Sequence, residues 1–479
     1  MEALFNITTY RPTRPPAPGT IELPSEEVAV LAAQLQDQTR NISKYPYDAD
    51  NWTRRADTLS RLRYPELAVG DANKATLLFR AHYKNLKEAR ANGSEWRLGH
   101  RIGFWMLDPT PRYQSEDLFD ETEYNEQLEQ YLRHIQRRIS KIEKRNLLFT
   151  ESGEEGRFRR RMYPWTHAQH RRRADTLVSQ MNKEFQASAE RIGSAQPACA
   201  IWRDAFGVPG SDVLGVFATR HIRKGETVLL DHTNVWGANY AYMASDNETL
   251  NTRIDHSAND QMQQAPLDLS WIRDEVGKQA GPVLLNCRLL LAGINDDAKH
   301  PLDHHLVARL TPTYHEDKIE PFVLLNDIII PNKALQTFGI DIFANQNYDT
   351  WVLLTIQARI QNNSCGDPSA DSLFPPFSLF NHSCDPNVEW NFPAGDHKTI
   401  VVKARRSIKL GEQMLVKYDQ IMRDQPLAAR RKRIYRWLDG PCMCTRCIRE
   451  EEESKHQVPA GRDWDDSGEE VVFPEDLLK

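Results

Sequence analysis

The chain has 479 residues, of which 40% are hydrophobic and 27% are charged, and its net charge is −6. This composition is typical of a globular protein with two or three domains, and the negative charge gives no general attraction to nucleic acid or anionic membranes. No apolar run approaches the roughly 18 residues of a membrane span, and no secretory signal is recognisable. We therefore expect a nuclear or cytoplasmic protein that does not contact membranes.

The N-terminal part of the chain is predicted to be helical. Residues 1–24 are rich in proline and indicate a flexible lead-in, and residues 25–150 follow as a helical region. Within this region, residues 48–81 predict a helical hairpin that turns at Tyr64-Pro65. Small and aromatic residues at helical spacing resemble one tetratricopeptide repeat, but an ordinary hairpin explains them equally well. These residues are Trp52, Ala56, Leu59, Ala68, Ala72 and Ala75.

A basic linker or helix is predicted over residues 151–195. Arginines are dense between Arg157 and Arg173, and Tyr163 and Trp165 lie among them. Basic residues mixed with aromatic ones can bind nucleic acid, which gives one candidate function. Because the total charge is acidic, we favour a solvated linker or helix face.

Four segments of the C-terminal half carry the candidate chemistry. Residues 214–229 predict two strands and a tight turn, with glycines where the chain reverses. Residues 359–364 follow, and then residues 377–388, which contain Asn-His-Ser-Cys. The last segment, residues 408–447, runs from a Gly-Glu turn through an apolar strand and Tyr418 to Cys-x-Cys-x2-Cys.

In this order the four segments resemble the SET-domain methyltransferases, specifically the branch related to the SET and MYND domain family. The resemblance spans about residues 199–447, and its most specific pieces are residues 380–387 and the three cysteines. The combination with a helical N-terminal region is similar to that of many fungal proteins. The fold that it implies is α+β, with a β-rich SET domain over residues 196–420, a helical insertion at about 241–355, a post-SET zinc segment over 421–450, and an acidic tail over 451–479.

The resemblance implies a methyltransferase that transfers a methyl group from S-adenosylmethionine to a protein lysine. Tyr418 matches the catalytic tyrosine, although a tyrosine at a strand end is commonly a core residue. Asn381 and His382 offer an amide and ring nitrogens to a polar cofactor, although Asn381 could instead satisfy backbone groups of a turn. Asn363 matches a residue that holds the amino-acid end of the cofactor. The residues assigned to cofactor binding are Gly215, Phe217, Asn363, Asn381, His382 and Tyr418.

One structural zinc is predicted at the three C-terminal cysteines. Cys442, Cys444 and Cys447 supply three thiolates, and a structural zinc takes four ligands. Cys384 is the obvious fourth, and the family uses the matching cysteine in this way. Four thiolates leave no open position, so this zinc is not catalytic. The remaining cysteines lack ligand spacing and are expected in the core or at the surface: Cys199, Cys287 and Cys365.

The sequence departs from the family pattern at three places. Val213 stands where a glycine is usual, and its side chain could crowd the cofactor. The insertion contains only Cys287 and scattered histidines in place of a cysteine-rich module, so we expect a helical insertion without a second zinc. Gly440 stands where an aromatic residue often lies near the adenine, and Trp437 either substitutes for it or packs in the core.

Three functions follow from these patterns. The first is a protein-lysine methyltransferase whose helical N-terminal region recruits a protein partner. The second is a SET-fold binding or scaffold protein with little or no turnover, which Val213 would favour. The third is a nucleic-acid-associated protein that uses the arginines between 157 and 173, although direct binding of nucleic acid is not expected.

Overall fold

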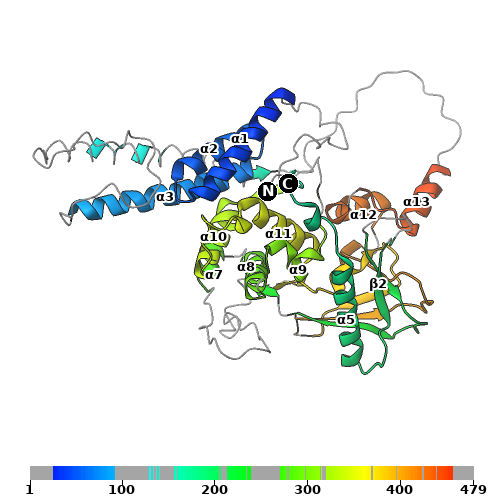
Figure 1. Ribbon diagram of the computed structural model, residues 1–479. Helices are drawn as coiled ribbons and strands as arrows, with labels where there is room; N and C mark the ends of the chain where they lie inside the picture. Colours follow the sequence, from blue (N-terminus) through cyan, green and yellow to red (C-terminus); the bar gives the residue numbers. More distant parts are fainter. Residues whose placement is uncertain are drawn as a thin grey trace, which may run out of the picture.

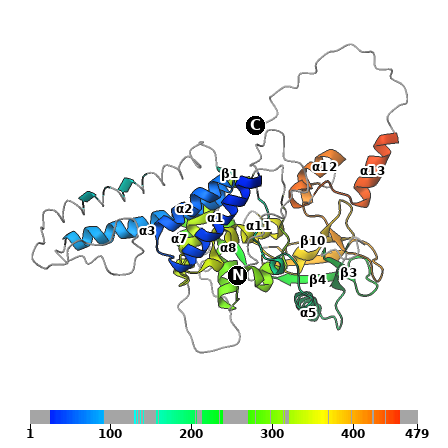
Figure 2. The ribbon, with the colours of Figure 1, turned by 45° about the horizontal axis from the view of Figure 1, so that its top comes forward.

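The computed structural model describes residues 25–91, six residues between 129 and 140, and residues 156–203, 205, 213–238, 270–312, 314 and 320–456, apart from isolated residues or pairs within these ranges. The described part is α+β, as predicted. Figures 1 and 2 show helices α1–α3 on one side, a helical middle part that includes α11, and a strand-rich part flanked by α12 and α13. In the described part, no helix is long and apolar enough to span a membrane.

Three helices make up the described residues 25–91. They are α1 (Ser25–Lys44), α2 (Ala49–Arg61) and α3 (Pro65–Ala91). Asp48 caps α2 by accepting a hydrogen bond from the backbone N–H of Asp50 at 2.9 Å, and Arg63 allows the turn before α3 with a φ of 63°. The predicted hairpin is confirmed, and Trp52 is buried between its helices. Because α1 also packs on α2, the hairpin belongs to a three-helix layer, and its identification as a repeat stays a prediction.

Buried ion pairs connect these helices to α11 (Thr350–Asn363). The guanidinium of Arg55 contacts the carboxylates of Asp71 at 2.7 Å and Asp349 at 2.8 Å, and the Lys74 ammonium lies 3.4 Å from Asp349. Asp349 also caps α11 by accepting a hydrogen bond from the backbone N–H of Thr350 at 2.9 Å. The N-terminal layer is therefore held against the helix that ends at Asn363.

The arginine-rich segment is partly packed into the protein and partly exposed, and its division as a basic linker or helix stays a prediction. Its residues form β1 (Gly156–Phe158), the 3-10 turn η3 (Ala168–His170) and α5 (Asp175–Arg191). Tyr163 and Trp165 stack on each other with ring centroids 5.6 Å apart and are buried against α2 and α3. Burial of these rings stabilises the segment because it removes apolar surface from water. Composition alone does not predict this tertiary contact.

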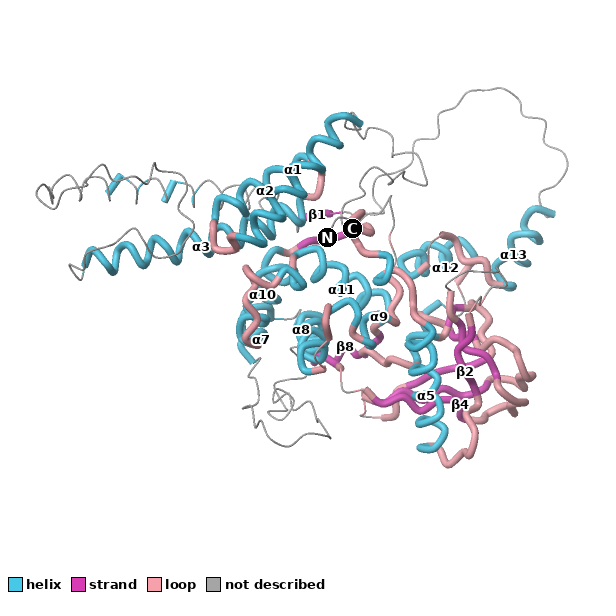
Figure 3. Tube along the Cα trace, viewed as in Figure 1, coloured by secondary structure: helices cyan, strands magenta, loops and turns pink. Residues whose placement is uncertain are grey.

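The strand-rich part contains several small sheets, drawn in magenta beside α5 in Figure 3. These sheets are antiparallel, with the orders β2–β3, β10–β11–β4, β5–β8–β7 and β1–β6. The strands β3 (Gly215–Ala218) and β4 (Thr227–His232) are the two expected from residues 214–229. Gly225 makes the turn before β4 with a φ of 82°. The strands are β2 (Cys199–Trp202), β3 (Gly215–Ala218), β4 (Thr227–His232), β5 (Trp236–Ala238), β6 (Glu320–Phe322), β7 (Cys365–Asp367), β8 (Ala370–Ser372), β9 (Asn381–His382), β10 (Val388–Asn391), β11 (Thr399–Ala404) and β12 (Leu415–Val416).

The described part of the insertion is helical, as predicted. Its centre is α8 (Ala280–Asn295), which is apolar and buried on all sides because other elements surround it. A Cβ atom on Gly237 of β5 would lie 2.0 Å from the backbone oxygen of Gly281, so α8 contacts this strand backbone to backbone. The other helical elements of the insertion are α7 (Ser270–Val276), η6 (Pro301–Asp303), α9 (His305–Ala308), η7 (Leu325–Ile329), α10 (Ile330–Thr337) and η8 (Gln346–Tyr348).

Short helices complete the C-terminal part. Two 3-10 turns flank the Asn-His-Ser-Cys strand and Tyr418, and α12 and α13 enclose the cysteine segment. They are η9 (Phe377–Leu379), η10 (Gln420–Met422), α12 (Leu427–Ile434), η11 (Tyr435–Trp437) and α13 (Thr445–His456).

Candidate active site and metal centre

A short parallel pair of strands brings the candidate residues together. Asn381 of β9 pairs with Leu415 of β12, and His382 pairs with Val416. Tyr418 follows two residues after this pair, so its ring lies 5.2 Å from the His382 ring, centroid to centroid. Parallel pairing of two very short strands depends on side-chain contacts for support, and the contacts of Asn381, His382 and Tyr418 provide them.

These three side chains are held by hydrogen bonds. The Asn381 amide donates to the backbone oxygen of Leu214 at 2.8 Å, and the backbone N–H of Tyr418 donates to Nδ1 of His382 at 3.2 Å. The Tyr418 hydroxyl donates to the backbone oxygen of Phe380 at 2.9 Å. Burial lowers the pKa of His382 to about 4, and burial raises the pKa of Tyr418. The imidazole is therefore neutral and the phenol protonated at neutral pH.

A cavity of about 1670 Å³ lies between the strand-rich part, the insertion and the cysteine segment. Asn363, Asn381, His382 and Tyr418 all line it, together with Val213. The Asn363 amide at the end of α11 donates to the backbone oxygens of Thr311 at 2.9 Å and Arg359 at 2.7 Å. Four candidates from three separate segments therefore share one cavity.

Gly215 and Phe217 are absent from the described lining of this cavity. The Phe217 ring is turned away and stacks on Trp202, with ring centroids 4.8 Å apart. A Cβ atom on Gly215 would lie 2.6 Å from Nε2 of Gln413 and 2.8 Å from Cβ of Ala205. The structure thus gives Gly215 a packing function, and the cavity wall at β3 is supplied by Val213 and Leu214 instead.

We expect Gly215→Ala to destabilise the protein by about 1–3 kcal/mol, because the added methyl group overpacks a contact with Ala205 and Gln413. Chemical denaturation measures this loss. Gly293→Ala is the control, because its Cβ would lie 3.7 Å from the nearest atoms of His304, an ordinary van der Waals distance, so it should cost little. A stability unchanged in Gly215→Ala would contradict the packing function.

The sequence did not single out several other residues of the cavity wall. Gln413 lines it, and its buried Nε2 has no hydrogen-bond partner. Phe377 and Trp390 add aromatic surface. Trp437, which the sequence left between two roles, lines the cavity and meets the Tyr418 ring edge-on at 6.3 Å. Of these residues, Trp437 was the one that the sequence indicated, because it lies shortly before Cys442.

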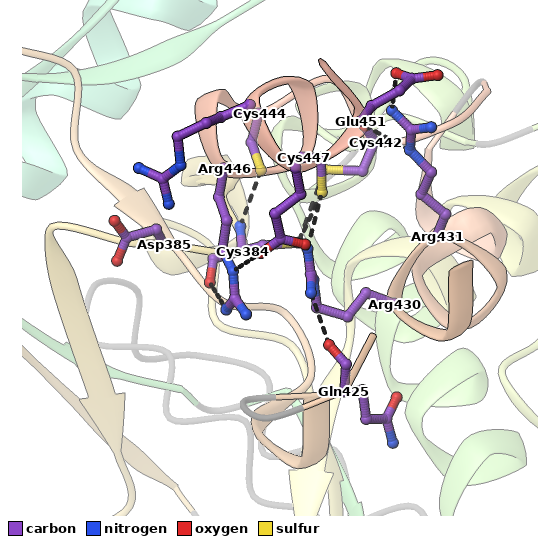
Figure 4. A network of polar contacts seen from close by, with 12 residues as sticks. Cys384, Asp385, Gln425, Arg430, Arg431, Cys442, Cys444, Arg446, Cys447 and Glu451 are labelled. Atoms are coloured by element: carbon purple, nitrogen blue, oxygen red, sulfur yellow. Dashed lines mark hydrogen bonds and ion pairs between the residues drawn. The ribbon is translucent and has the colours of Figure 1, made fainter. Parts of the chain in front are cut away.

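The four cysteines gather at one point, with their sulfur atoms all within 4.8 Å of one another. Sγ of Cys384 lies 4.0 Å from that of Cys442 and 3.5 Å from that of Cys447, and the backbone N–H of Cys384 contacts Sγ of Cys444 at 3.4 Å. Figure 4 shows the three C-terminal cysteines directed toward Cys384. Zn–S bonds of about 2.3 Å in a tetrahedron require sulfurs about 3.8 Å apart, so the set fits a closed zinc site.

A buried arginine supports this cluster. Arg430 is 1% exposed, and its guanidinium lies 3.7 Å from Sγ of Cys447 and 2.6 Å from the carboxylate of Glu450. Its positive charge offsets part of the negative charge that four thiolates place on zinc. Outside the cluster, Cys199 and Cys287 are buried and Cys365 is partly buried, as expected.

A second group of possible metal ligands lies in the described part of the insertion. Asp296, His304 and His305 have ligand atoms within 4.8 Å of one another. Nε2 of His304 lies 2.9 Å from the Asp296 carboxylate, and Arg309 nearby opposes a bound cation. The absence of a second zinc stays a prediction.

Comparison with known proteins decides the family of the strand-rich part. Residues 213–419 match the family model described as SET domain. Residues 213–419 are a SET domain. The region matched begins at the cavity residue Val213 and ends one residue after Tyr418, so it contains the shared cavity residues but not the C-terminal cysteines.

The relatives of this SET domain match over short regions. A SET and MYND domain-containing protein of Dictyostelium discoideum is 29% identical over 20% of this chain and 18% of its own length. Histone-lysine N-methyltransferase SET5 of Vanderwaltozyma polyspora is 38% identical over 17% and 15%, and human histone-lysine N-methyltransferase SMYD3 is 31% identical over 22% and 23%. The chain thus spans less than a quarter of the length of these relatives.

Solved structures similar to this chain include Rubisco LSMT bound to AdoMet. The match covers 55% of this chain and 57% of that one, at 13% identity and a TM-score of 0.34.

Proposed function

We propose that the protein transfers a methyl group from S-adenosylmethionine to a lysine side chain of another protein. The observation that carries this proposal is the shared cavity, in which Asn363, Asn381 and His382 lie with the phenol of Tyr418. The names of the SET5 and SMYD3 relatives describe lysine methyltransferases, which supports the same reaction for the SET domain of this chain.

The residues of the cavity fit such a cofactor. The cofactor supplies a methyl group bound to a sulfonium sulfur, and its amine, carboxylate and adenine need polar partners. The wall offers the amides of Asn363 and Asn381 and the unpartnered Nε2 of Gln413. Both ring nitrogens of His382 are engaged, Nδ1 by the backbone N–H of Tyr418 and Nε2 by Sγ of Cys384 at 3.4 Å, so this ring shapes the wall. An unpartnered buried donor costs about 1–3 kcal/mol, so a bound acceptor would stabilise this arrangement.

Tyr418 would orient the lysine amine. Its hydroxyl is fixed by the backbone oxygen of Phe380 and stays protonated, because burial raises its pKa. The oxygen still has lone pairs that can accept a hydrogen bond from the amine and align it. Phe377 and Trp390 line the same cavity, and an apolar surface next to an amine favours its neutral, reactive form.

We expect Tyr418→Phe to lower kcat by about 100-fold or more, within the range for loss of one positioned polar group. The substitution keeps the ring and its packing against Trp437. Methyl transfer from labelled S-adenosylmethionine to a protein extract measures the rate, and calorimetry measures cofactor binding. We expect cofactor affinity to change by less than about threefold, because the ring is retained.

A second candidate function is a SET-domain scaffold that binds ligands without turnover. It is favoured by Val213, which is 40% exposed and lines the cavity where the family has glycine. Cofactor binding without methyl transfer by the wild-type protein would establish this candidate. Restored transfer in Val213→Gly would then identify Val213 as the cause.

A further inference from the structure

We propose that arginines on the cavity wall bind the carboxylates of an acidic segment next to the substrate lysine, which names a substrate class for the function proposed above. The described lining contains three carboxylate residues, Glu320, Asp371 and Asp419, and no lysine. It contains twice as many arginines, namely Arg160, Arg171, Arg173, Arg309, Arg433 and Arg436.

Two of these arginines are already neutralised by neighbouring carboxylates. Arg309 binds Glu184 through two hydrogen bonds of 2.6 Å, and Arg433 binds Asp419. No ion pair of Arg160 or Arg171 is found within the described part, although the carboxylates of Glu320 and Asp327 act on the charge of Arg160. Among the described residues, the Nε of Arg160 has no hydrogen-bond partner, and the guanidinium of Arg171 donates to the backbone oxygen of Pro164 at 3.1 Å.

A buried arginine adds to the positive charge behind this wall. Arg359 is 5% exposed, and its guanidinium donates to the backbone oxygens of Val307 and His170, while its Nε has no partner. The charges of Arg359, Arg160 and Arg171 all act on the phenol of Tyr314, whose pKa is nevertheless raised because burial outweighs them. Arg160, Arg171 and Tyr314 line the same cavity.

Carboxylates are the ligands that suit this arrangement. An unpartnered positive charge that is buried, as in Arg359, or partly buried, as in Arg160, is costly. A planar guanidinium, including that of the exposed Arg171, binds a carboxylate through two parallel hydrogen bonds. The backbone oxygen of Arg359 accepts the hydrogen bond of Asn363, so the basic wall adjoins the site proposed for the cofactor. An acidic side chain close to the lysine in sequence would reach this wall.

Nucleic acid is a poorer ligand for the same arginines. Tyr163 and Trp165, the aromatic residues of the arginine-rich segment, are 2% and 7% exposed. They are therefore not available to stack on bases.

Binding of two labelled peptides to the full-length protein tests the inference. Both contain one lysine, flanked on each side by two glutamates in one peptide and by two glutamines in the other. With S-adenosylhomocysteine present, fluorescence anisotropy should show about tenfold tighter binding of the glutamate peptide, the ratio that corresponds to about 1.4 kcal/mol. This preference should decrease in high salt. Equal affinity for the two peptides would overturn the proposal.

Variants locate the effect on the wall. Arg171→Gln should reduce the preference to less than about threefold, and Arg171→Lys should keep part of it through the retained charge. Arg172→Gln is the matched control, since Arg172 is also exposed but is not among the lining residues. Arg171 is exposed, so its replacement should leave the fold intact. An equal loss in Arg172→Gln would overturn the assignment to the wall.

Two further measurements distinguish an acidic peptide from the cofactor and from nucleic acid as the ligand of these arginines. If Arg171→Gln weakens binding of the cofactor and not of the peptide, the wall serves the cofactor carboxylate and the inference is wrong. Tighter binding of a single-stranded oligonucleotide than of the glutamate peptide would also overturn it. Peptide binding is measured independently of methyl transfer. Preference for the glutamate peptide without methyl transfer would contradict only the proposed function. Methyl transfer without preference for the glutamate peptide would contradict only this inference.

Discussion

Cys444→Ser is expected to lose zinc and to open the wall of the cavity. A serine hydroxyl is a poor substitute for one of four thiolates. Loss of a hydrogen-bond partner outside the coordination sphere already costs about 10–100-fold in metal affinity. We therefore expect zinc affinity to decrease by more than about 100-fold when a ligand itself is replaced. Cys444 and its neighbours Cys442 and Met443 line the cavity. Affinity for S-adenosylmethionine should therefore fall together with the zinc content, as measured by elemental analysis and calorimetry.

Cys287→Ala provides the control for this prediction. Cys287 is completely buried in α8 and lies outside the four-cysteine cluster. Its replacement should leave the zinc content unchanged and lower stability by about 1 kcal/mol, typical of a small truncation in the core. Wild-type protein purified without chelators and found to contain no zinc would contradict the metal assignment itself.

The cysteine cluster was predictable because a structural zinc requires four ligands, which the sequence must supply. Three cysteines lie within six residues, and a closed zinc site requires one more ligand. Cys384 lies far away in the chain, but the resemblance marked it, and the structure brings its sulfur within 4.0 Å of that of Cys442. Asn381 and His382 lie three and two residues before this ligand, and their pairing with β12 places them on the cavity.

Other parts of the site could not be predicted, because they depend on which face a side chain occupies. Phe217 lies in a strand whose alternate residues point to opposite sides, and the packing of Trp202 against it decides that it turns away from the cavity. Arg160 and Arg171 lie in a segment that composition describes only as basic. Their position on the wall follows from burial of Tyr163 and Trp165 against the N-terminal helices.

The helices were more predictable than the contacts between them. Periodicity places Trp52 on the buried face of a hairpin, as the structure confirms. Nothing in the sequence indicates that Arg55 on the next turn contacts Asp349. This ion pair holds the N-terminal helices against the SET-domain side of the protein. Its contribution to the free energy of unfolding can be measured.

Asp349→Asn is expected to destabilise the protein by about 3–5 kcal/mol, the range for removal of one partner from a buried ion pair. The change leaves the charges of Arg55 and Lys74 with only the carboxylate of Asp71 between them. Asparagine caps a helix about as well as aspartate, so the cap on Thr350 is kept and the loss reports the charge. Equilibrium unfolding in urea measures the difference. Asp37→Asn, in an exposed pair with Arg40, should cost at most about 1 kcal/mol.

The pH dependence of the same variant tests the origin of the loss. Burial alone would raise the pKa of Asp349, but the charges of Arg55 and Lys74 outweigh it and hold the pKa below its usual value. A carboxyl with a depressed pKa in the folded state stabilises fully above its unfolded pKa of about 4, and this stabilisation is lost as the pH falls through the folded value. The difference between wild type and Asp349→Asn should therefore be constant near pH 7 and shrink below about pH 4. A difference that persists unchanged in acid would assign the loss to packing, and the N-terminal helices would then be held by Trp52 and its apolar neighbours instead.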